Sequence, residues 1–336
     1  MSKKYGKYTY KNEEEIGIGS YGCAYLARNE EEKEGEKKLY VIKFPLGDKM
    51  DSEQKKDFDN EVKLLNKLSK ISGNKYTSFA YDSQTFEEIK KEDNKIEENT
   101  IENPEENKEE EKAKADVKPY YVMDYFSRGI LYSYVVSRKL TTRQAKVIFR
   151  KLIESFKFLH EKCGILHLDI KLDNIILDNE FQPIIIDFTF SQEYKDALGN
   201  ITPVTTVGGS DDYRAPEIYE RKELNDEKAD VFSLGVVLFN LITCRIAFDS
   251  SQKEDERYKL IRKKDYDSYW GIMNLLNLSD EFKDLYQRMV AYKPGERPTF
   301  DDILNHPFLK DVKELTPEEE VKIREELEEL YLKKRI

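Results

Sequence analysis

Cysteine, histidine and tryptophan are scarce in this chain of 336 residues, which has three cysteines, three histidines and one tryptophan. The cysteines are an odd number, lie far apart and form no C-x-x-C pair; they are Cys23, Cys163 and Cys244. A disulfide framework uses an even number of cysteines, usually more than three, and a structural zinc site needs closely spaced ligand pairs. The cysteine pattern therefore argues against both and suits a reducing compartment.

A long apolar run is also missing. The most apolar stretch, Val231–Ile246, is interrupted by polar residues such as Asn240 and Arg245, whereas a membrane span needs about 20 predominantly apolar residues. The first residues lack the apolar segment of a signal peptide, and Ser2 replaces the glycine that N-myristoylation requires. We therefore expect a soluble, cytoplasmic protein with no membrane partner, and nuclear access stays open.

An excess of positive charge is absent as well. The chain has 56 Lys and Arg against 67 Asp and Glu, which gives a net charge of −11. A phosphate backbone is held by a net basic face, so we expect no nucleic-acid partner. With 39% hydrophobic and 12% aromatic residues, the chain can bury a sizeable core.

One acidic segment, residues 87–118, differs from the rest in composition. It holds 13 acidic residues, seven lysines and no aromatic residue, so it carries −6 of the net charge. Its few apolar residues cannot offset the entropy of ordering it. The composition predicts a disordered insertion.

The remaining pattern divides the chain in two. Strand-like runs cover residues 8–18, 23–28 and 39–44, and an apolar helical periodicity follows over residues 52–68. Beyond Met123 the periodicity is helical, over residues 141–159, 230–243 and 279–292. This order predicts an α+β protein with a small β-rich N-terminal lobe and a larger α-helical C-terminal lobe.

The C-terminal tail, residues 310–336, predicts a last helix. Thr316, Pro317 and Glu319 match an N-cap, a first-turn proline and the acidic partner of a capping box. Apolar residues then recur along one helical face. The pattern leaves two interpretations open, a helix packed on the larger lobe and a docking or autoregulatory segment.

A glycine-rich turn, Gly17-Ile18-Gly19-Ser20-Tyr21-Gly22, joins the first two strand-like runs. A dinucleotide-binding fingerprint would open a helix within a βαβ unit, whereas here a strand follows. Glycines in a β-hairpin allow backbone N–H groups to approach phosphates closely. The turn alone is weak evidence for a nucleotide site.

The next strand-like run carries a lysine, Lys43, among apolar neighbours. A lysine in that setting is costly unless it is paired with an acidic group. The register of the following helix favours Glu61 as the partner, with Glu53 as the alternative. Such a pair would hold the ammonium group toward nucleotide phosphates.

Two further apolar runs end in polar residues with complementary chemistry. Asp169 can accept a hydroxyl proton and Lys171 can neutralise a phosphoryl oxygen, while Asn174 and Asp187 carry oxygen atoms that suit Mg²⁺. Each residue alone is as well explained as a turn or solvated polar residue. Their joint occurrence in this order indicates phosphoryl transfer.

The ordered motifs resemble the signature set of the eukaryotic protein kinase family, over about residues 8–309. The N-lobe would span about residues 8–123 and the C-lobe about residues 127–309. Further motifs support the resemblance: Ala215-Pro216-Glu217, the helix motif Asp230–Gly235, Arg297 as the partner of Glu217, and His306-Pro307-Phe308 at the end of the domain.

The resemblance implies ATP with Mg²⁺, or alternatively Mn²⁺, as cofactors. Lys43 would contact the α and β phosphates and Glu61 would hold it, Asp169 would act as the base, and Asn174 and Asp187 would bind the metal. Met123 would be the gatekeeper, and Asp124–Phe126 the hinge. The residues implied in nucleotide binding are Ile16, Gly17, Ile18, Gly19, Ser20, Tyr21, Gly22, Ala24, Val41, Lys43, Met123, Asp124 and Phe126.

Lysine at position 171 resembles Ser/Thr kinases, so the implied activity is ATP-dependent phosphorylation of Ser/Thr hydroxyls on protein substrates. Residues 255–269 loosely resemble the calcium/calmodulin-dependent group. The negative net charge and Asp173 suggest basic residues near the acceptor, and a monomer is favoured. The alternative is a nucleotide-binding pseudokinase that acts as a scaffold, which the unusual Leu168 and Thr189 would favour.

Two departures from the family pattern carry expectations. Leu168 stands where the family has the arginine that receives the activation-loop phosphate, so we expect activity that does not depend on phosphorylation of Thr205 or Thr206. Thr189 stands where the family has glycine. A stiff β-branched residue there predicts restricted movement of the preceding Asp187-Phe188 pair.

Overall fold

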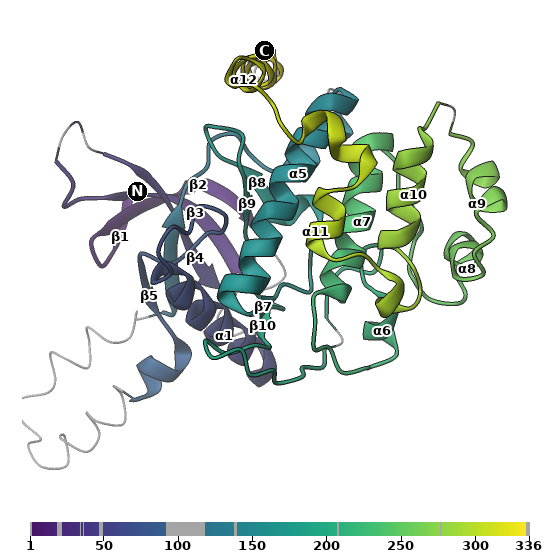
Figure 1. Ribbon diagram of the computed structural model, residues 1–336. Coiled ribbons are helices and arrows are strands. Elements are labelled where there is room, and N and C mark those ends of the chain that lie inside the picture. Colours follow the sequence, from purple (N-terminus) through teal and green to yellow (C-terminus); the bar gives the residue numbers. More distant parts are fainter. Residues whose placement is uncertain are drawn as a thin grey trace, which may run out of the picture. The chain divides into compact units, whose positions relative to one another are not determined.

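The structure is a computed structural model, which describes residues 2–18, 22–33, 35, 37–46, 50–91, 118–137, 140–206, 208–275 and 277–333. The chain forms two compact units (Figure 1). Unit 1 comprises Met1–Asn74 and Ser78–Tyr125, and unit 2 comprises Lys75–Thr77 and Phe126–Ile336. Residues 92–117 of the predicted insertion and the glycine-turn residues Gly19, Ser20 and Tyr21 lie outside the described residues.

Unit 1 is built on a six-stranded antiparallel sheet in the order β1-β2-β3-β4-β6-β5. Its first strand lies ahead of residue 8, where the sequence pattern places the start of the domain. The strands are β1 (Ser2–Tyr5), β2 (Tyr8–Ile18), β3 (Gly22–Asn29), β4 (Leu39–Pro45), β5 (Asp82–Gln84) and β6 (Tyr120–Asp124).

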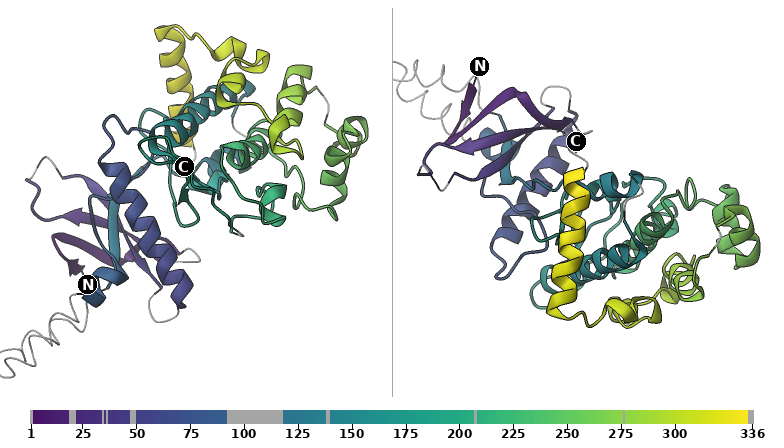
Figure 2. Two further views of the ribbon diagram at one scale, coloured as in Figure 1. Left: turned by 60° about the horizontal axis from the view of Figure 1, so that its bottom comes forward. Right: turned by 90° about the horizontal axis from the view of Figure 1, so that it is seen from above.

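The two faces of this sheet bury different side chains, because successive residues of a strand point to opposite faces. On β4, Tyr40, Ile42 and Phe44 belong to an aromatic-rich cluster together with residues of β2 and β6. Helix α1 (Ser52–Ser69) lies along the sheet of unit 1 (Figure 2), and Lys43, which alternates with Ile42 and Phe44 on β4, contacts Glu61 of this helix. The buried side of α1 includes Phe58, whose ring lies 5.8 Å from that of Tyr121.

A short helix over residues 86–91 corrects the N-terminal edge of the predicted disordered insertion. The carboxylate of Asp59 accepts the backbone N–H groups of Phe86 and Glu87 at 2.8 and 3.0 Å, and so caps the start of this helix. The Phe86 ring packs 5.9 Å from that of Phe58. Composition alone missed the helix because both anchors lie on α1, far away in the sequence.

Unit 2 is largely helical, and α7 (Lys228–Thr243) is buried along most of its length. Around it the chain forms α4 (Leu131–Val136), α5 (Thr142–Phe158), α6 (Pro216–Tyr219), α8 (Glu256–Arg262), α9 (Tyr266–Met273), α10 (Asp280–Met289), α11 (Phe300–Leu304) and α12 (Pro317–Lys333). The predicted α+β class, with a β-rich N-terminal unit and a larger helical C-terminal unit, is confirmed. No helix within the described ranges is both long enough and apolar enough to cross a membrane.

Helix α12, formed by the tail, lies beside α5 within unit 2 (Figure 2). Its apolar residues Ile323 and Leu327 are buried, and Glu328 forms an ion pair with Arg128 at 2.8 Å. The Arg128 guanidinium also lies over the ring of Tyr331, 4.5 Å from its centroid. The start of the helix is fixed by Thr316 and Glu319, whose side chains bond each other's backbone N–H groups at 3.2 and 3.0 Å.

Candidate active site

In unit 1, the register of the sheet places five of the predicted nucleotide-binding residues on one face. Gly17 lies opposite Ala24, Ala24 lies opposite Lys43, and Val41 lies opposite Met123. Directly opposed residues on paired strands point to the same face, and so do residues two apart on one strand. The five residues therefore share the sheet face on which α1 packs.

Lys43 and Glu61 are brought together on this face. The Lys43 ammonium nitrogen lies 3.2 Å from Glu61 Oε2, and the Glu61 side chain is only 1% exposed. The hydroxyl of Tyr121 donates a hydrogen bond to Glu61 Oε1 at 3.0 Å, and the Lys43 ammonium group lies 5.3 Å from the centre of the Tyr121 ring. Glu61 is thus held from two sides, which fixes the position of the lysine charge.

At the end of the glycine-rich turn, Gly22 leaves no room for a side chain. A Cβ atom on this residue would lie 2.5 Å from the carbonyl oxygen of Phe44, so that no side chain fits without moving the backbone of β4. On the other arm of the turn, Ile16 and Ile18 are apolar yet 48% and 65% exposed. Ile18 lies opposite Cys23, and Cys23 lies opposite Phe44, so the register places Ile18 on the other sheet face from Gly17, Ala24 and Lys43.

The predicted hinge spans the boundary of the two units, with Asp124 at the end of β6 in unit 1 and Phe126 in unit 2. Asp124 forms an ion pair with Lys38 and accepts a hydrogen bond from the hydroxyl of Tyr81 at 2.8 Å. The Tyr125 N–H donates to the carbonyl oxygen of Leu39 at 3.3 Å. These contacts fix the end of β6 against β4.

In unit 2, a short hairpin places the two predicted metal ligands at the same end. Strands β8 (Ile175–Leu177) and β9 (Pro183–Ile185) are antiparallel, with Asn174 just before the first and Asp187 just after the second. The ladder continues beyond the strands, since the Ile186 N–H donates to the Asn174 carbonyl oxygen at 3.1 Å. Asn174 and Asp187 are therefore neighbours although 13 positions separate them.

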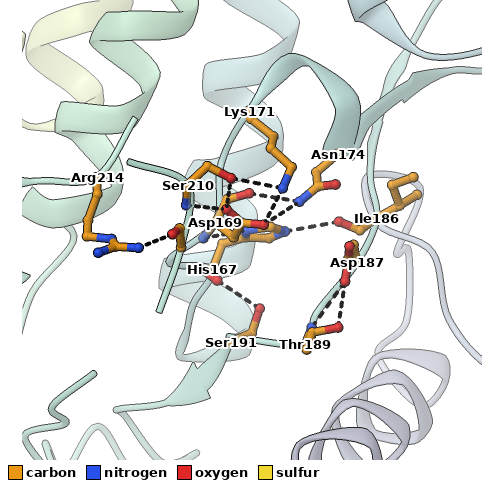
Figure 3. A network of polar contacts seen from close by, with 11 residues as sticks. His167, Asp169, Lys171, Asn174, Ile186, Asp187, Thr189, Ser191, Ser210 and Arg214 are labelled. Atoms are coloured by element: carbon orange, nitrogen blue, oxygen red, sulfur yellow. Dashed lines mark hydrogen bonds and ion pairs between the residues drawn. The ribbon is translucent and has the colours of Figure 1, made fainter. Parts of the chain in front are cut away.

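Asp169 lies at the centre of a hydrogen-bond network, shown in Figure 3. Its Oδ1 accepts both the N–H and the hydroxyl of Ser210, each at 2.8 Å. Its Oδ2 accepts the Lys171 ammonium at 2.7 Å and the Asn174 amide at 3.1 Å. Lys171 also donates to the Ser210 hydroxyl at 3.0 Å. Four donors thus hold a carboxylate that is only 5% exposed.

The backbone of this loop is anchored by Asp230 of α7, which is completely buried. Its carboxylate accepts the N–H groups of His167 and Leu168 at 2.8 and 2.9 Å, and pairs with the ring of His160 at 2.9 Å. Leu168 has a left-handed φ of 65°, which costs about 1–2 kcal/mol for a residue with a side chain. The bonds to Asp230 stabilise that conformation.

The same contacts also affect the pKa of Asp230. Burial alone would raise it, but the hydrogen bond and charge of His160, with the charge and backbone N–H of His167, outweigh burial and lower the pKa from its ordinary value. Since the pKa is lower in the folded state, the carboxylate stabilises the fold above its ordinary pKa, and this contribution is lost as the pH falls through the lowered value.

The oxygen atoms of Asn174 and Asp187 suit a magnesium ion whose other ligands are water and phosphate oxygens. Within the parts of the chain that the structure describes, no three His, Cys, Asp or Glu side chains are grouped to hold a metal. The side-chain amide N–H groups of Asn174 donate hydrogen bonds to Asp169, so the amide oxygen of Asn174 is turned away from that residue (Figure 3). One amide oxygen and the carboxylate of Asp187 match the few protein ligands that Mg²⁺ takes in phosphate sites.

Comparison with known families decides the identity. The model of the protein kinase domain matches residues 10–309, nearly nine-tenths of the chain. The chain belongs to the protein kinase family. The predicted resemblance is therefore confirmed at family level, and the kinase domain covers both units.

Curated relatives resemble part of this kinase. It is 31% identical over 195 residues to "Putative serine/threonine-protein kinase YPL150W" of Saccharomyces cerevisiae. The aligned region covers 57% of this chain and 20% of the relative. It is 32% identical over 200 residues to "Probable serine/threonine-protein kinase MARK-A" of Dictyostelium discoideum, covering 58% of this chain and 18% of the relative. The chain thus aligns with about a fifth of the length of these relatives.

Two side chains at the kinase site were missed by reasoning from the sequence. Tyr121 holds Glu61, and its signal was the strand alternation that places it on the same face as Met123. Thr189 donates its hydroxyl to Asp187, and no sequence pattern indicated that bond. For Thr189 the sequence predicted only restricted movement of Asp187 and Phe188.

Proposed function

We propose that this kinase transfers the γ-phosphoryl group of Mg-ATP to Ser and Thr hydroxyls of protein substrates. The network around Asp169 supports this activity most directly. It joins a buried carboxylate, an ammonium group, a hydroxyl and an amide within hydrogen-bond distance. A scaffold that only bound nucleotide would have no need to hold a carboxylate and a lysine together in this way.

Each residue has a role that follows from its contacts. Lys43, held by Glu61, binds nucleotide phosphates in unit 1. Asp169 orients the acceptor hydroxyl and takes its proton, and Lys171 neutralises charge on the transferred group. These residues catalyse chiefly by positioning and by electrostatic stabilisation, which dominate phosphoryl transfer.

Asn174 and Asp187 would hold the magnesium ion through oxygen atoms. The ion supplies charge neutralisation at the phosphate oxygens. Gly17, Ala24, Val41 and Met123 would contact the nucleotide, as their shared sheet face supports. The hinge would hydrogen-bond its base.

The choice of acceptor follows from Lys171 and Ser210. The Lys171 ammonium group donates to the Ser210 hydroxyl and to Asp169 Oδ2, and the Ser210 hydroxyl donates to Asp169 Oδ1. Lys171 is also the residue on which the resemblance to Ser/Thr kinases rests. Asp173 is exposed on the same loop. With the net charge of −11, its carboxylate favours substrates with basic residues near the acceptor.

The test measures transfer of labelled γ-phosphate from Mg-ATP to a mixture of basic proteins, followed by identification of the labelled amino acids. We expect label on Ser and Thr, with the Asp169→Asn variant as the blank. If the wild type transfers nothing while ATP raises its thermal midpoint by linkage, the scaffold alternative holds. If nucleotide neither stabilises the protein nor donates phosphate, the nucleotide site itself is wrongly assigned.

Activity is expected to be independent of phosphorylation in the activation segment. The contacts of Thr205 and Thr206 in the described structure are with neutral groups: the Thr205 carbonyl accepts from Gln192, and the Thr206 hydroxyl accepts from the Gly208 N–H. Leu168, where the family has arginine, is buried and apolar. A phosphate gains stabilisation chiefly from cationic partners, so the Thr205→Ala/Thr206→Ala variant should keep the wild-type rate of phosphate transfer.

Phosphatase treatment of the wild type provides the matched measurement. The treated and untreated proteins should phosphorylate substrate equally, and mass spectrometry should verify that the treatment removed any phosphate. A loss of activity both in the double variant and after treatment, regained on rephosphorylation, would show that these threonines do regulate the enzyme.

A further inference from the structure

The segment that carries Asp187 has an unusual local conformation. Asp187 has a left-handed φ of 63°, a region that aspartate enters more easily than most residues but still at a cost. Phe188 is fully buried, and its ring lies 5.4 Å from that of His167. Thr189 follows at 5% exposure. A buried threonine hydroxyl requires a hydrogen-bond partner in the protein.

That partner is the carboxylate of Asp187. The Thr189 hydroxyl donates to Asp187 Oδ1 at 2.7 Å, and the Thr189 N–H approaches the same oxygen at 3.4 Å (Figure 3). The hydroxyl bond is therefore the stronger of the two. Because the β-branched threonine side chain is restricted at χ1, the direction of its hydroxyl is set by the backbone.

Hydrogen bonds join the turn that contains Thr189 to the loop that carries Asp169. The Nε2–H of His167 donates to the Ile186 carbonyl oxygen at 3.1 Å, because a carbonyl oxygen can only accept, and the Ser191 hydroxyl donates to the His167 carbonyl oxygen at 3.1 Å. Ile186 and Ser191 lie on either side of the Asp187–Thr189 turn. The turn is thus fixed at both ends to the loop that carries Asp169.

We propose that Thr189 is a positioning residue for the metal-binding carboxylate of Asp187. Its hydroxyl holds Oδ1, which fixes the rotation of the carboxylate and directs the group toward the ion. This inference rests on the proposed function, because it assigns Asp187 to the metal. A carboxylate has about four lone-pair positions, so it can accept from Thr189 and bind a metal at once.

Loss of the hydroxyl should weaken metal binding more than nucleotide binding. Removing a hydrogen-bond partner that orients a metal ligand typically lowers metal affinity by about 10–100-fold. Valine has nearly the shape of threonine but cannot donate, whereas serine keeps the hydroxyl and loses only the methyl group. Comparing the valine and serine variants therefore separates the effect of the hydrogen bond from the effect of side-chain packing.

The experiment titrates Mn²⁺ into the full chain in the presence of a non-hydrolysable ATP analogue and follows bound Mn²⁺ by its electron paramagnetic resonance. We expect Thr189→Val to bind Mn²⁺ at least about tenfold more weakly than the wild type, and Thr189→Ser to recover most of that loss. Thr243→Val is the matched control, since the Thr243 hydroxyl donates to the Phe239 carbonyl oxygen at 2.8 Å in α7. Its Mn²⁺ affinity should equal that of the wild type.

The thermal midpoint of each variant is measured alongside, so that a folding defect is seen directly. Equal Mn²⁺ affinity of the valine variant and the wild type would overturn the inference and leave the kinase assignment intact. Equal weakening by valine and serine would overturn it too, because packing would then explain the effect. A wild type that takes up no Mn²⁺ with the analogue would overturn both this inference and the metal site of the proposed function.

Discussion

The Asp169→Asn variant should lose phosphoryl transfer by a factor of about 10²–10⁴, the usual contribution of a positioned general base. An amide can still accept from the Ser210 N–H through its oxygen. Its nitrogen would then face the Lys171 ammonium group, which donates to Asp169 Oδ2 at 2.7 Å in the wild type. The substitution therefore removes the base and also places two hydrogen-bond donors, the new amide nitrogen and the Lys171 ammonium group, face to face.

Measurement of transfer and of nucleotide binding separates these effects. ATP binding, followed by the rise in thermal midpoint, should be retained, because the Lys43–Glu61 pair is in unit 1 and is unchanged. Asp196→Asn is the matched control. Asp196 is exposed; its Oδ1 accepts the N–H groups of Leu198 and Asn200, a role that asparagine can keep, and its Oδ2 accepts the exposed side-chain amide of Asn200, which can rotate to accept from asparagine instead. Wild-type transfer by Asp169→Asn would contradict the assignment of this residue as the base.

Much of the site could be predicted from the sequence because it depends on local periodicity. The strand alternation of β4 and the helix register of α1 are sufficient to bring Lys43 and Glu61 together. Short motifs likewise placed Asp169, Lys171 and Asn174 on one loop. These predictions needed only the spacing of residues along regular elements and the order of the motifs.

The remaining features depend on tertiary geometry. The left-handed conformations of Leu168 and Asp187 are stabilised by hydrogen bonds that local propensity does not encode. Thr189 was expected only to restrict the movement of Asp187 and Phe188 through its β-branched side chain, whereas its hydroxyl also bonds the Asp187 carboxylate. The helix over residues 86–91 depends on Asp59, 27 positions before its first residue. A composition-based prediction has no access to such contacts.

The other large effect is expected at the buried ion pair between Arg297 and Glu217. The guanidinium donates to the two carboxylate oxygens at 2.6 and 2.8 Å, and the Arg297 side chain is completely buried. Its remaining N–H groups donate to the carbonyl oxygens of Ala291, Lys228 and Tyr292. All five donors of the guanidinium are therefore used, and Glu217 ties α6 to the rest of unit 2.

Arg297→Met should lower the free energy of unfolding by about 3–5 kcal/mol, because it leaves the Glu217 carboxylate buried without its partner. Combining it with Glu217→Leu should restore part of the loss, since an apolar pair is often tolerated where one unpaired charge is not. Lys264→Met is the control; its ion pair with Glu296 at 3.0 Å is largely exposed, and such pairs contribute about 0–1 kcal/mol.

Thermal and denaturant unfolding of the four proteins measure these differences, and phosphate transfer is measured in parallel. Glu217 lies seven positions after Ser210, whose N–H and hydroxyl bond Asp169, so release of α6 should also lower the transfer rate. If Arg297→Met unfolded like the Lys264 control, the pair would not stabilise unit 2. If stability fell while transfer per folded molecule stayed the same, the pair would stabilise the fold without positioning the segment that carries Ser210.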